Sequence, residues 1–238
     1  MKKVISVLLM AVILLCLCSC DSANQGNNKV PIATQEARWK VGDIVTFGSY
    51  PQTRTGNDNT PIEWLVLAWD GDKALIISKY SLDCVQYNTK NSDVTWETCS
   101  LRRWLNNDFY NKAFSTIEKQ NIVSSKVTAD KNPEYSTNPG KDTTDRVFLL
   151  SISEVGKYFS GNKNGMCAPT DYAIKKNSEH ISEEYKVAGR SCGWWWLRSP
   201  GNSNSNAAYV YYDGSVSNYG RYVNTSYARV RPCMWVRK

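Results

Sequence analysis

Residues 202–229 constrain the fold most strongly, because apolar and polar side chains alternate on both sides of the pair Asp213-Gly214. An Asp-Gly pair between two alternating runs is a strong signal for a β-hairpin. A type I turn with a left-handed bulge at Gly214 would pair Val210 with Val216 and bury both valines together. A two-residue turn would send the valines to opposite faces, so the bulged register is the prediction.

The other face of this hairpin is aromatic and polar. It is predicted to present Tyr209, Tyr211, Ser215 and Ser217. The alternation continues toward the carboxyl end. There the residues predicted to face inward are Val223, Ala228 and Val230, and those predicted to face outward are Tyr222, Asn224, Tyr227 and Arg229. An apolar face beneath a face of Tyr, Asn and Ser indicates a scaffold that carries a recognition surface.

Tyrosine, asparagine and serine dominate residues 202–229, which hold six of the chain's 14 tyrosines. Tyrosine offers a large contact area at low entropic cost, and Ser and Asn offer adaptable hydrogen bonds, as in antibody paratopes. The simpler alternative is a polar hairpin that binds nothing. The residues predicted to contact a ligand are Asn202, Ser203, Asn204, Asn206, Tyr209, Tyr211, Ser215, Ser217, Asn218, Tyr219, Tyr222, Asn224, Ser226, Tyr227 and Arg229.

The amino terminus has the pattern of a secretory signal, with two lysines, a short apolar run over residues 4–17 and small polar residues after it. The apolar run is too short to be read as a membrane span. The sequence Leu17-Cys18-Ser19-Cys20 resembles a bacterial lipobox, although Cys18 stands where Ala, Ser or Thr is usual. We therefore predict that residues 1–19 are removed and that Cys20 carries a lipid. Simple secretion is the alternative.

Residues 20–37 comprise the lipidated cysteine and a polar stretch that predicts a flexible tether. Residues 38–238 suit a single domain with a sizeable core. The formal charge of +7 falls to about +5 once Lys2 and Lys3 leave with the signal. Acidic and basic residues are interspersed, and no block of Lys or Arg stands out, so no nucleic-acid partner is predicted.

The cysteine and histidine content argues against a metal centre or a catalytic site. The cysteines that remain after processing are Cys84, Cys99, Cys167, Cys192 and Cys233. An odd number allows at most two disulfides, and Cys84 with Cys99 is the first candidate pair. No Cys-x-x-Cys spacing exists and His180 is the only histidine, so we predict no metal, no cofactor and no hydrolase triad. His180 is expected to face solvent.

Trp194-Trp195-Trp196 could form a sugar platform, but core packing is the favoured interpretation, because alternation buries at least one of three consecutive side chains. Arg198 and Arg231 are predicted to brace loops through backbone carbonyls or acids. Asp43 and Asp213 are predicted at turns or strand ends. Motifs of calcium-dependent lectins are missing from the sequence.

The other elements are short and predict an α+β domain. Strands are predicted over residues 41–48, 62–68, 73–78 and 146–151, with a hairpin turn at 69–72. Helices are predicted over residues 98–114, 115–121, 153–159 and 171–176. Thr98 or Ser100 is expected to cap the first helix, and Ser115 with Glu118 to form a capping box on the second. Residues 131–145 predict a loop.

Several motifs carry a resemblance that spans nearly the whole mature chain. They include Gly193-Trp194-Trp195-Trp196-Leu197-Arg198-Ser199-Pro200-Gly201, Asp213-Gly214-Ser215-Val216, Val230-Arg231-Pro232, and the stretches 42–48, 61–64 and 95–106. Together they resemble a bacterial family with a C-type-lectin-like fold, related to the formylglycine-generating enzymes. Cys233 departs from the pattern, since an apolar residue such as Ala is more usual there.

Members of that group include the variable proteins of diversity-generating retroelements, some of which are surface lipoproteins. In these proteins, copying errors at template adenines yield mainly Asn, Ser, Tyr and Asp. Residues 202–229 have this bias and precede Val230-Arg231-Pro232. The resemblance therefore implies a C-type-lectin-like α+β domain, small helices and an antiparallel sheet included, whose outward residues form a diversified ligand site.

The sequence thus predicts a lipid-anchored binding protein of the cell envelope that performs no chemistry. Its expected partners are a protein or glycan ligand on another cell, phage or host, and a membrane reached through the lipid on Cys20. The second interpretation is an envelope lipoprotein of fixed sequence with a structural or enzyme-accessory role. The third is an enzyme, which would require a reactive thiol.

Overall fold

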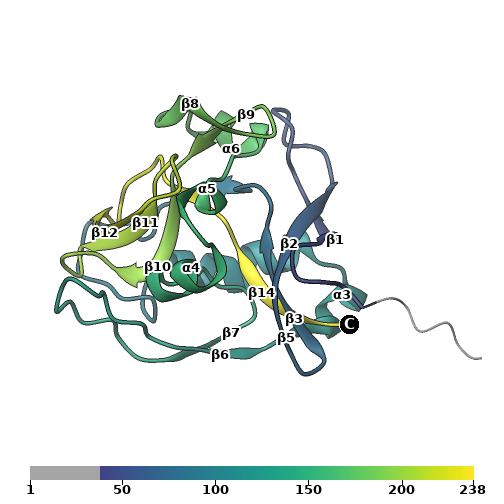
Figure 1. The fold of residues 1–238 in the computed structure, drawn as a ribbon, viewed down its shortest axis with the longest axis horizontal. Helices are drawn as coiled ribbons and strands as arrows, with labels where there is room; N and C mark the ends of the chain where they lie inside the picture. Colours follow the sequence, from purple (N-terminus) through teal and green to yellow (C-terminus); the bar gives the residue numbers. More distant parts are fainter. Residues whose placement is uncertain (1–37) are drawn as a thin grey trace, which may run out of the picture. The chain divides into compact units, whose positions relative to one another are not determined.

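Strands from both ends of the described chain meet in one antiparallel sheet. Its members are β1 (Ile44–Tyr50), β2 (Thr60–Asp70), β3 (Lys73–Ser78), β14 (Cys233–Arg237) and β5 (Ile122–Val123), in the order β1-β2-β3-β14-β5. Asp70 pairs with Lys73 across the predicted β2–β3 turn. The last strand thus lies inside the sheet that the first strands begin, between β3 and β5 (Figure 1).

A second five-stranded sheet carries the carboxyl-terminal hairpin. Its members are β12 (Val216–Tyr222), β11 (Asn206–Val210), β10 (Trp195–Pro200), β13 (Arg229–Val230) and β4 (Asp83–Cys84), in the order β12-β11-β10-β13-β4. The β10–β13 pair is parallel and the other pairs are antiparallel. Strand β12 is therefore an edge strand, at the left of Figure 1.

The predicted helical region after residue 98 is nearly continuous. It consists of α1 (Ser100–Trp104), a π-helical turn η1 (Leu105–Phe109) and α2 (Tyr110–Ala113). The cap is neither Thr98 nor Ser100, because the Cys99 sulfur accepts the Arg102 N–H. The short helices that follow are α3 (Thr116–Asn121), α4 (Ile152–Tyr158), α5 (Asn162–Gly165) and α6 (Asp171–Lys176). Ser115 and Glu118 form the predicted capping box on α3.

The strand expected over residues 146–151 is wrong. Only Phe148 makes a β-bridge, to Cys233. The neighbouring backbone groups bond to side chains instead: the Asn106 Oδ1 accepts the Arg146 N–H at 2.8 Å, and the Leu149 carbonyl accepts Arg198 Nη1 at 2.8 Å. Residues 147–150 are apolar and buried, but side chains take the place of ladder partners at Arg146 and Leu149.

Two small hairpins complete the topology. Strands β6 (Ser125–Val127) and β7 (Thr143–Asp145) flank the predicted 131–145 loop, and β7 takes the end of that loop. Strands β8 (Ile181–Val187) and β9 (Arg190–Gly193) form a polar hairpin at the top of Figure 1. Neither was predicted, because their alternation is weak.

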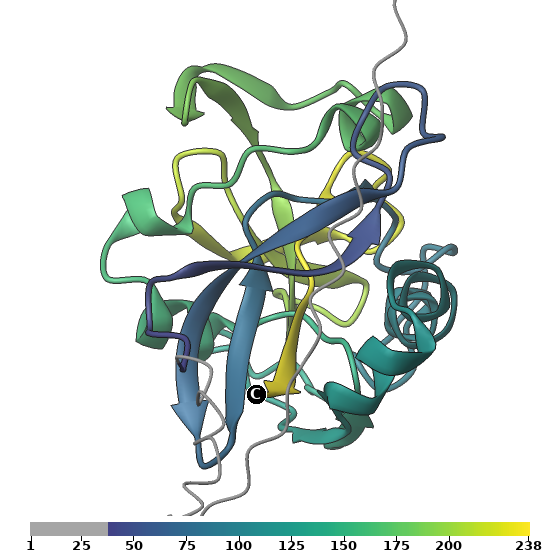
Figure 2. The same cartoon turned by 90° about the vertical axis from the view of Figure 1, so that its right-hand side faces the viewer.

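The core lies between the two sheets and the α1–α2 region (Figure 2). Its largest fully buried side chains include Trp64, Trp195 and Trp196. Trp194 is also buried, so core packing rather than an open platform is the correct interpretation of the tryptophan run. The fold is mixed α+β, mostly β with short helices, as predicted.

The computed structural model describes residues 38–238, which form one compact unit. The predicted signal at residues 1–19, the lipidated Cys20 and the tether to residue 37 lie outside the described residues. Within the described part, no helix is long and apolar enough to cross a membrane.

Candidate ligand-binding surface

The β11–β12 hairpin has the predicted bulged register. Val210 pairs with Val216, and Gly214 is left-handed with a φ of +84°. The Tyr211 N–H donates to the Ser215 carbonyl at 2.8 Å. The turn prediction is confirmed, since Gly214 accepts the backbone conformation that the bulge requires.

The tip of this hairpin is fixed against the rest of the domain. The Asp213 carboxylate accepts the Ser215 N–H at 2.9 Å, which confirms its role as a turn residue. A Cβ on Gly214 would lie 1.7 Å from the Asn162 carbonyl oxygen of α5. A Cβ on Gly165 would lie 2.7 Å from the Gly214 carbonyl oxygen. Backbone contact with α5 therefore leaves the tip little freedom to move.

The prediction that Tyr209, Asn206 and Arg229 face outward is wrong. Tyr209 is only 3% exposed, and Asn206 and Arg229 are also buried. The Trp194 ring stacks on Tyr209, and Tyr227 in turn packs against Trp194. Alternation along the chain does not reveal this burial, because the covering residue Trp194 comes from outside the hairpin.

The covering residues and the hairpin together form an aromatic cluster, defined here as His180, Trp194, Tyr209, Tyr211 and Tyr227. The Trp194 ring stacks with His180 at 4.6 Å and with Tyr209 at 4.7 Å between centroids. Tyr211 and Tyr227 meet it edge-on at 5.0 and 5.4 Å. Stacked and edge-on contacts both stabilise aromatic rings, so the cluster is rigid.

Solvent reaches the cluster at its rim. His180 is exposed, as predicted, but it packs 4.0 Å from the Tyr227 ring and has a left-handed φ of +53°. Tyr211 and Tyr227 are half-buried, and Arg221 Nε donates to the Tyr227 hydroxyl at 2.8 Å. The rim therefore offers ring faces, hydroxyls and a guanidinium to a ligand.

Burial governs the ionisation of the cluster. Desolvation, and then the hydrogen bond with Tyr211, raise the pKa of Tyr209, so its phenol is neutral. Desolvation lowers the pKa of His180, and the charges of Arg221 and Arg229 lower it further, while Glu179 opposes them. The Trp194 Nε1 is buried without a hydrogen-bond partner, which lowers the stability of the fold because the indole N–H loses its hydration.

Arg229 is fully buried, so it supports the aromatic cluster through hydrogen bonds to backbone carbonyls and does not form part of the exposed surface. Its guanidinium donates to the carbonyls of Tyr227 at 2.8 Å, Glu179 at 2.8 Å and Asn177 at 3.0 Å. Desolvation lowers the pKa of this guanidinium, because the carbonyls carry no full negative charge. The residue ties the segment before β8 to the segment before β13.

The fully exposed part of the predicted surface lies on and after β12. Tyr219 is 59% exposed and Tyr222 is 56% exposed, and Ser226 is exposed as well. Tyr135 packs edge-on against Tyr219 at 6.1 Å between centroids. The other predicted residues are half-buried: Asn202, Ser203, Asn204, Tyr211, Ser215, Ser217, Asn218, Asn224 and Tyr227.

The amino-terminal end of the predicted surface is separate from the aromatic cluster. Asn204 belongs to the lining of a 460 Å³ cavity that includes Thr95, Glu97 and Lys141. Its carbonyl accepts the Val94 N–H at 2.9 Å, and its amide donates to the Asn138 carbonyl at 2.7 Å. Residues 202–229 therefore contribute to two places on the surface and not to one continuous face.

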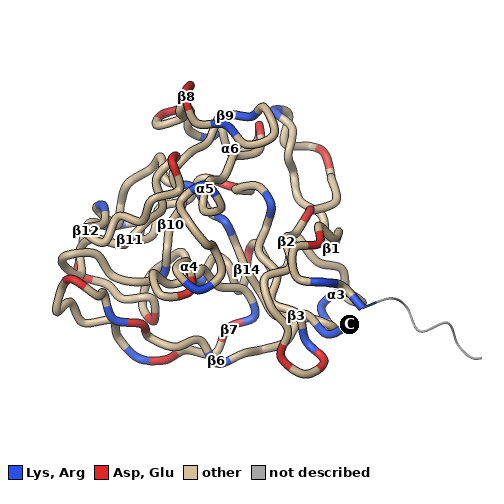
Figure 3. Tube along the Cα trace, in the orientation of Figure 1, with Lys and Arg blue, Asp and Glu red and all other residues tan. Residues whose placement is uncertain are grey.

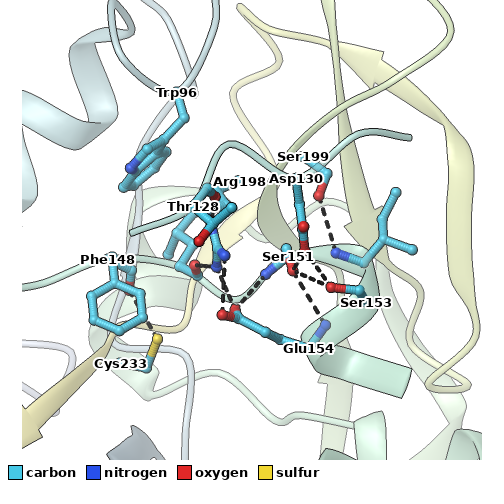
Figure 4. Close-up of polar contacts among 12 residues, drawn as sticks. Trp96, Thr128, Asp130, Phe148, Ser151, Ser153, Glu154, Arg198, Ser199 and Cys233 are labelled. Atoms are coloured by element: carbon cyan, nitrogen blue, oxygen red, sulfur yellow. Dashed lines mark hydrogen bonds and ion pairs between the residues drawn. The ribbon is translucent and has the colours of Figure 1, made fainter. Parts of the chain in front are cut away.

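Arg198 of the Trp-Leu-Arg-Ser-Pro sequence anchors β10 to the segments that carry Thr128 and Glu154 (Figure 4). It donates to the Thr128 carbonyl at 3.2 Å and pairs with Glu154, whose second contact through Nη2 is 3.0 Å. Glu154 also accepts the Ser151 N–H at 2.9 Å. The predicted bracing role of Arg198 is confirmed, and Arg231 acts likewise on the Ser78 carbonyl at 2.9 Å.

The predicted Cys84–Cys99 disulfide is wrong, because the cysteines of residues 38–238 are all free. Burial raises the pKa of the Cys84 thiol to about 11 and that of Cys99 to about 12. Sequence spacing placed the two near each other in the chain, but Cys84 lies on β4 and Cys99 caps α1. Among the described residues, no group of three or more His, Cys, Asp or Glu is placed to hold a metal.

Sequence reasoning missed three contributors to the surface. Trp194 was assigned to the core, and His180 to a solvated segment, yet both belong to the aromatic cluster. Tyr212 was also left out, although it stacks with Tyr185 of β8 at 5.5 Å. Alternation along 194–196 could have placed Trp194 on the Tyr209 face. No sequence signal pointed to His180.

Two sheets and a rigid aromatic surface at the β11–β12 hairpin define an α+β domain with short helices. A family model described as "Domain of unknown function (DUF6273)" matches residues 71–238, and the chain belongs to this family. The matched region contains the whole hairpin and the aromatic cluster. Comparisons with curated proteins and with solved structures gave no match.

Proposed function

We propose that this chain is a lipid-anchored, surface-displayed ligand-binding protein. Its binding face would be the rim of the aromatic cluster together with the exposed residues of β12. The observation that carries the proposal is a set of solvent-accessible tyrosines: Tyr211 and Tyr227, which ring contacts hold at the rim, and Tyr219 and Tyr222, which are exposed on the strand. Rigid, partly exposed tyrosines are typical anchors of interfaces.

The ligand would be a protein or a glycan on another cell, phage or host, and no catalysis is proposed. The buried thiols support a non-catalytic role, because burial raises the pKa of Cys192 to about 11 and disfavours its reactive thiolate. His180 packs between the Trp194 and Tyr227 rings, and no carboxylate of residues 38–238 hydrogen-bonds to its ring to orient it as a base.

A screen of the mature chain against a glycan array and against panels of bacterial cells and phage tests this function. Tyr219→Ala with Tyr222→Ala should abolish or strongly weaken each hit while leaving the unfolding midpoint unchanged, because both side chains are exposed. Losing one central tyrosine anchor should cost about 2 kcal/mol of binding. Hits that persist unchanged in the double variant would overturn the assignment of the face.

We further propose that the fold is C-type-lectin-like. In support, the first strands and the last strand share one sheet, and the second sheet is built largely from the late hairpins. The proposed tether and lipid on Cys20 would attach this domain to the envelope. An experimental structure that superposes on no C-type-lectin-like domain would refute this proposal.

One observation favours the second candidate, an envelope lipoprotein of fixed sequence. Three residues of the predicted variable set, Asn206, Tyr209 and Arg229, are buried and serve the fold. The gene sequence from several isolates separates the two candidates. Substitutions concentrated at exposed positions beside a reverse-transcriptase gene support a retroelement variable protein, and uniform drift along the chain supports the fixed lipoprotein.

A further inference from the structure

Two half-buried tryptophans lie where the described chain begins and ends, and each has a cation over its ring. The Arg38 guanidinium carbon is 3.7 Å from the Trp69 ring centroid. The Lys238 Nζ is 5.1 Å from the Trp39 ring centroid. The indole N–H of Trp69 donates to the Trp39 carbonyl at 2.9 Å, so the two pairs adjoin each other.

A third pair extends the same surface along β3 and β14. The Lys73 Nζ is 5.2 Å from the ring centroid of half-buried Trp235. Lys73 also pairs with Arg237 in the strand register. The Arg38 side chain donates to the Gly71 carbonyl at 2.6 Å, in the turn that precedes Lys73. We call this surface the terminal patch, and it consists of Arg38, Trp39, Trp69, Lys73, Trp235, Arg237 and Lys238.

Two exposed apolar side chains follow Trp39 of the terminal patch in the sequence, by two and by five residues. Val41 is 63% exposed and Ile44 is 46% exposed. Val41 is at the tip of a turn in which the Asp43 N–H donates to the Lys40 carbonyl at 3.0 Å. The next residue, Gly42, donates to the Val66 carbonyl at 2.9 Å, which ties this turn to β2. The turn is therefore fixed while its apolar side chain remains in solvent.

The charge of this region is only moderately positive. Acids offset some of its cations: Asp70 pairs with Lys73 at 3.0 Å and Asp72 with Arg237 at 3.5 Å. Figure 3 shows the basic residues around the carboxyl terminus and the start of the described chain, with acids at the β2–β3 turn. Indoles and apolar side chains should therefore dominate any contact made here, with electrostatics as the smaller contribution.

The position of the terminal patch relates it to the proposed anchor. Seventeen residues separate Cys20 from Arg38 in the sequence. Fully extended, such a segment reaches roughly 60 Å, so a lipid on Cys20 would by itself leave the orientation of the domain open. Both ends of the described chain lie on the side opposite β12 (Figures 1 and 2).

We propose that the terminal patch, with Val41 and Ile44, seats the domain on the anionic membrane surface to which Cys20 is attached. Tryptophan, lysine and arginine are the side chains enriched at the interface between water and lipid headgroups. Indole rings and the two aliphatic side chains would enter the headgroup region, and the basic groups would meet lipid phosphates. This seating directs β12 away from the bilayer. This inference rests on the proposed function in one respect, because the proposed lipid on Cys20 identifies the membrane.

Cosedimentation with vesicles tests whether the terminal patch binds a membrane when the lipid anchor is absent. The full mature chain carrying Cys20→Ser is mixed with phosphatidylcholine vesicles that contain phosphatidylglycerol. We expect the chain to bind, and Val41→Ser with Ile44→Ser to weaken binding about tenfold, since both side chains lose their apolar burial. Tyr219→Ser with Tyr222→Ser, which removes exposed aromatic area at the opposite side, should bind as the parent chain does.

Quenching of tryptophan fluorescence by doxyl-labelled phosphatidylcholine locates the contact. Trp69→Phe should remove much of the quenchable emission, whereas Trp104→Phe, which removes a half-buried tryptophan of α1, should not. Failure of the parent chain to bind vesicles, or equal binding by the Val41/Ile44 variant, would overturn the seat. So would self-association that this variant abolishes in the absence of vesicles, because the patch would then bind a second copy.

The two proposals fail in different measurements. The vesicle experiment contains no ligand, and the tyrosine variants leave the terminal patch intact. If the chain binds vesicles as described but no ligand depends on the tyrosines, the proposed membrane contact is supported and the proposed binding function is refuted. If the chain binds a tyrosine-dependent ligand but not vesicles, the binding function is supported and the membrane contact is refuted.

Discussion

At Arg229, one guanidinium joins the segments before β8 and β13. Its three shortest bonds go to the carbonyls of Tyr227, Glu179 and Asn177. A lysine ammonium keeps the charge but cannot reproduce the fork of donors. We expect Arg229→Lys to destabilise the domain by about 2 kcal/mol, because hydrogen bonds from a buried side chain to these carbonyls are lost. Urea unfolding measures this cost.

The matched control is Arg221→Lys. Arg221 is exposed, and its Nε donates a hydrogen bond to the Tyr227 hydroxyl. This variant should unfold within about 0.5 kcal/mol of the parent chain, as surface substitutions usually do. An Arg229→Lys variant as stable as the Arg221→Lys variant would show that the carbonyls find other donors, and that the cluster does not depend on this guanidinium.

His180 is the only histidine in the chain, so its titration can be followed without ambiguity by nuclear magnetic resonance. Partial desolvation by the neighbouring rings lowers the pKa of exposed His180 below its ordinary value of 6.5, and the nearby arginines act in the same direction. Below that value the unfolded chain binds more protons at this residue than the folded chain does. His180 therefore contributes a loss of stability as pH falls through the unfolded pKa.

Two measurements check this effect. The ring resonances of His180 in the untagged protein should titrate with a pKa below 6.5. His180→Gln should reduce the drop in urea stability between neutral and mildly acidic pH. A measured pKa above the ordinary value would mean that Glu179 dominates the site, and that the stacked ring carries a proton at rest.

At the scale of elements, the β11–β12 turn depends on the absence of a side chain at Gly214. Gly214 and Gly71 both have left-handed φ angles, +84° and +61°. A Cβ at Gly71 would meet nothing within 4 Å, whereas one at Gly214 would lie 1.7 Å from the Asn162 carbonyl oxygen. Gly71→Ala should therefore cost about 1 kcal/mol from conformation alone.

Gly214→Ala should cost at least about 2 kcal/mol more than Gly71→Ala, because the backbone of α5 must also shift. Urea unfolding of the two variants separates the steric cost from the conformational one. The same substitution should weaken ligand binding through displacement of the hairpin. Equal costs at the two glycines would show that α5 yields easily and that the hairpin tip is mobile.

Alternation and turn chemistry were sufficient to predict several elements. The β2–β3 hairpin, the bulged β11–β12 register and the Ser115 capping box depend on neighbours in the sequence, and all three are confirmed. The candidate site could be predicted only in part. Alternation shows which residues share a face, but Tyr209 is covered by Trp194, and that contact depends on segments that are distant in sequence.

Burial also restricts which positions of residues 202–229 can vary. Tyr219, Tyr222 and Ser226 are exposed, and substitutions there cost little stability. Tyr209 and Arg229 are buried and bonded within the fold. Under the retroelement proposal, isolates should differ at the exposed positions and preserve these two. Frequent substitutions at Arg229 among folded, expressed variants would contradict both the variable-face proposal and the bracing role.

At the scale of the whole molecule, stability comes from two packed sheets and not from covalent links. Within residues 38–238 every cysteine is free, and Cys99, Cys167, Cys192 and Cys233 are buried. Side chains from the first sheet, the second sheet and the α1–α2 region join in one core. A reductant should therefore leave the midpoint of thermal unfolding unchanged, unlike in secreted domains that depend on disulfides.

Counting the reactive thiols tests directly whether the domain contains a disulfide. Burial raises the pKa of Cys99 to about 12, and even half-buried Cys84 is raised to about 11, so both thiols are protonated at pH 8. The folded mature chain should react slowly with a disulfide reagent, because the thiolate is the reactive species. In guanidinium five thiols should react with the reagent, one for each of the cysteines within residues 38–238. A count of three, or a lower unfolding midpoint in reductant, would show that a disulfide forms and that the sheets alone do not hold the domain together.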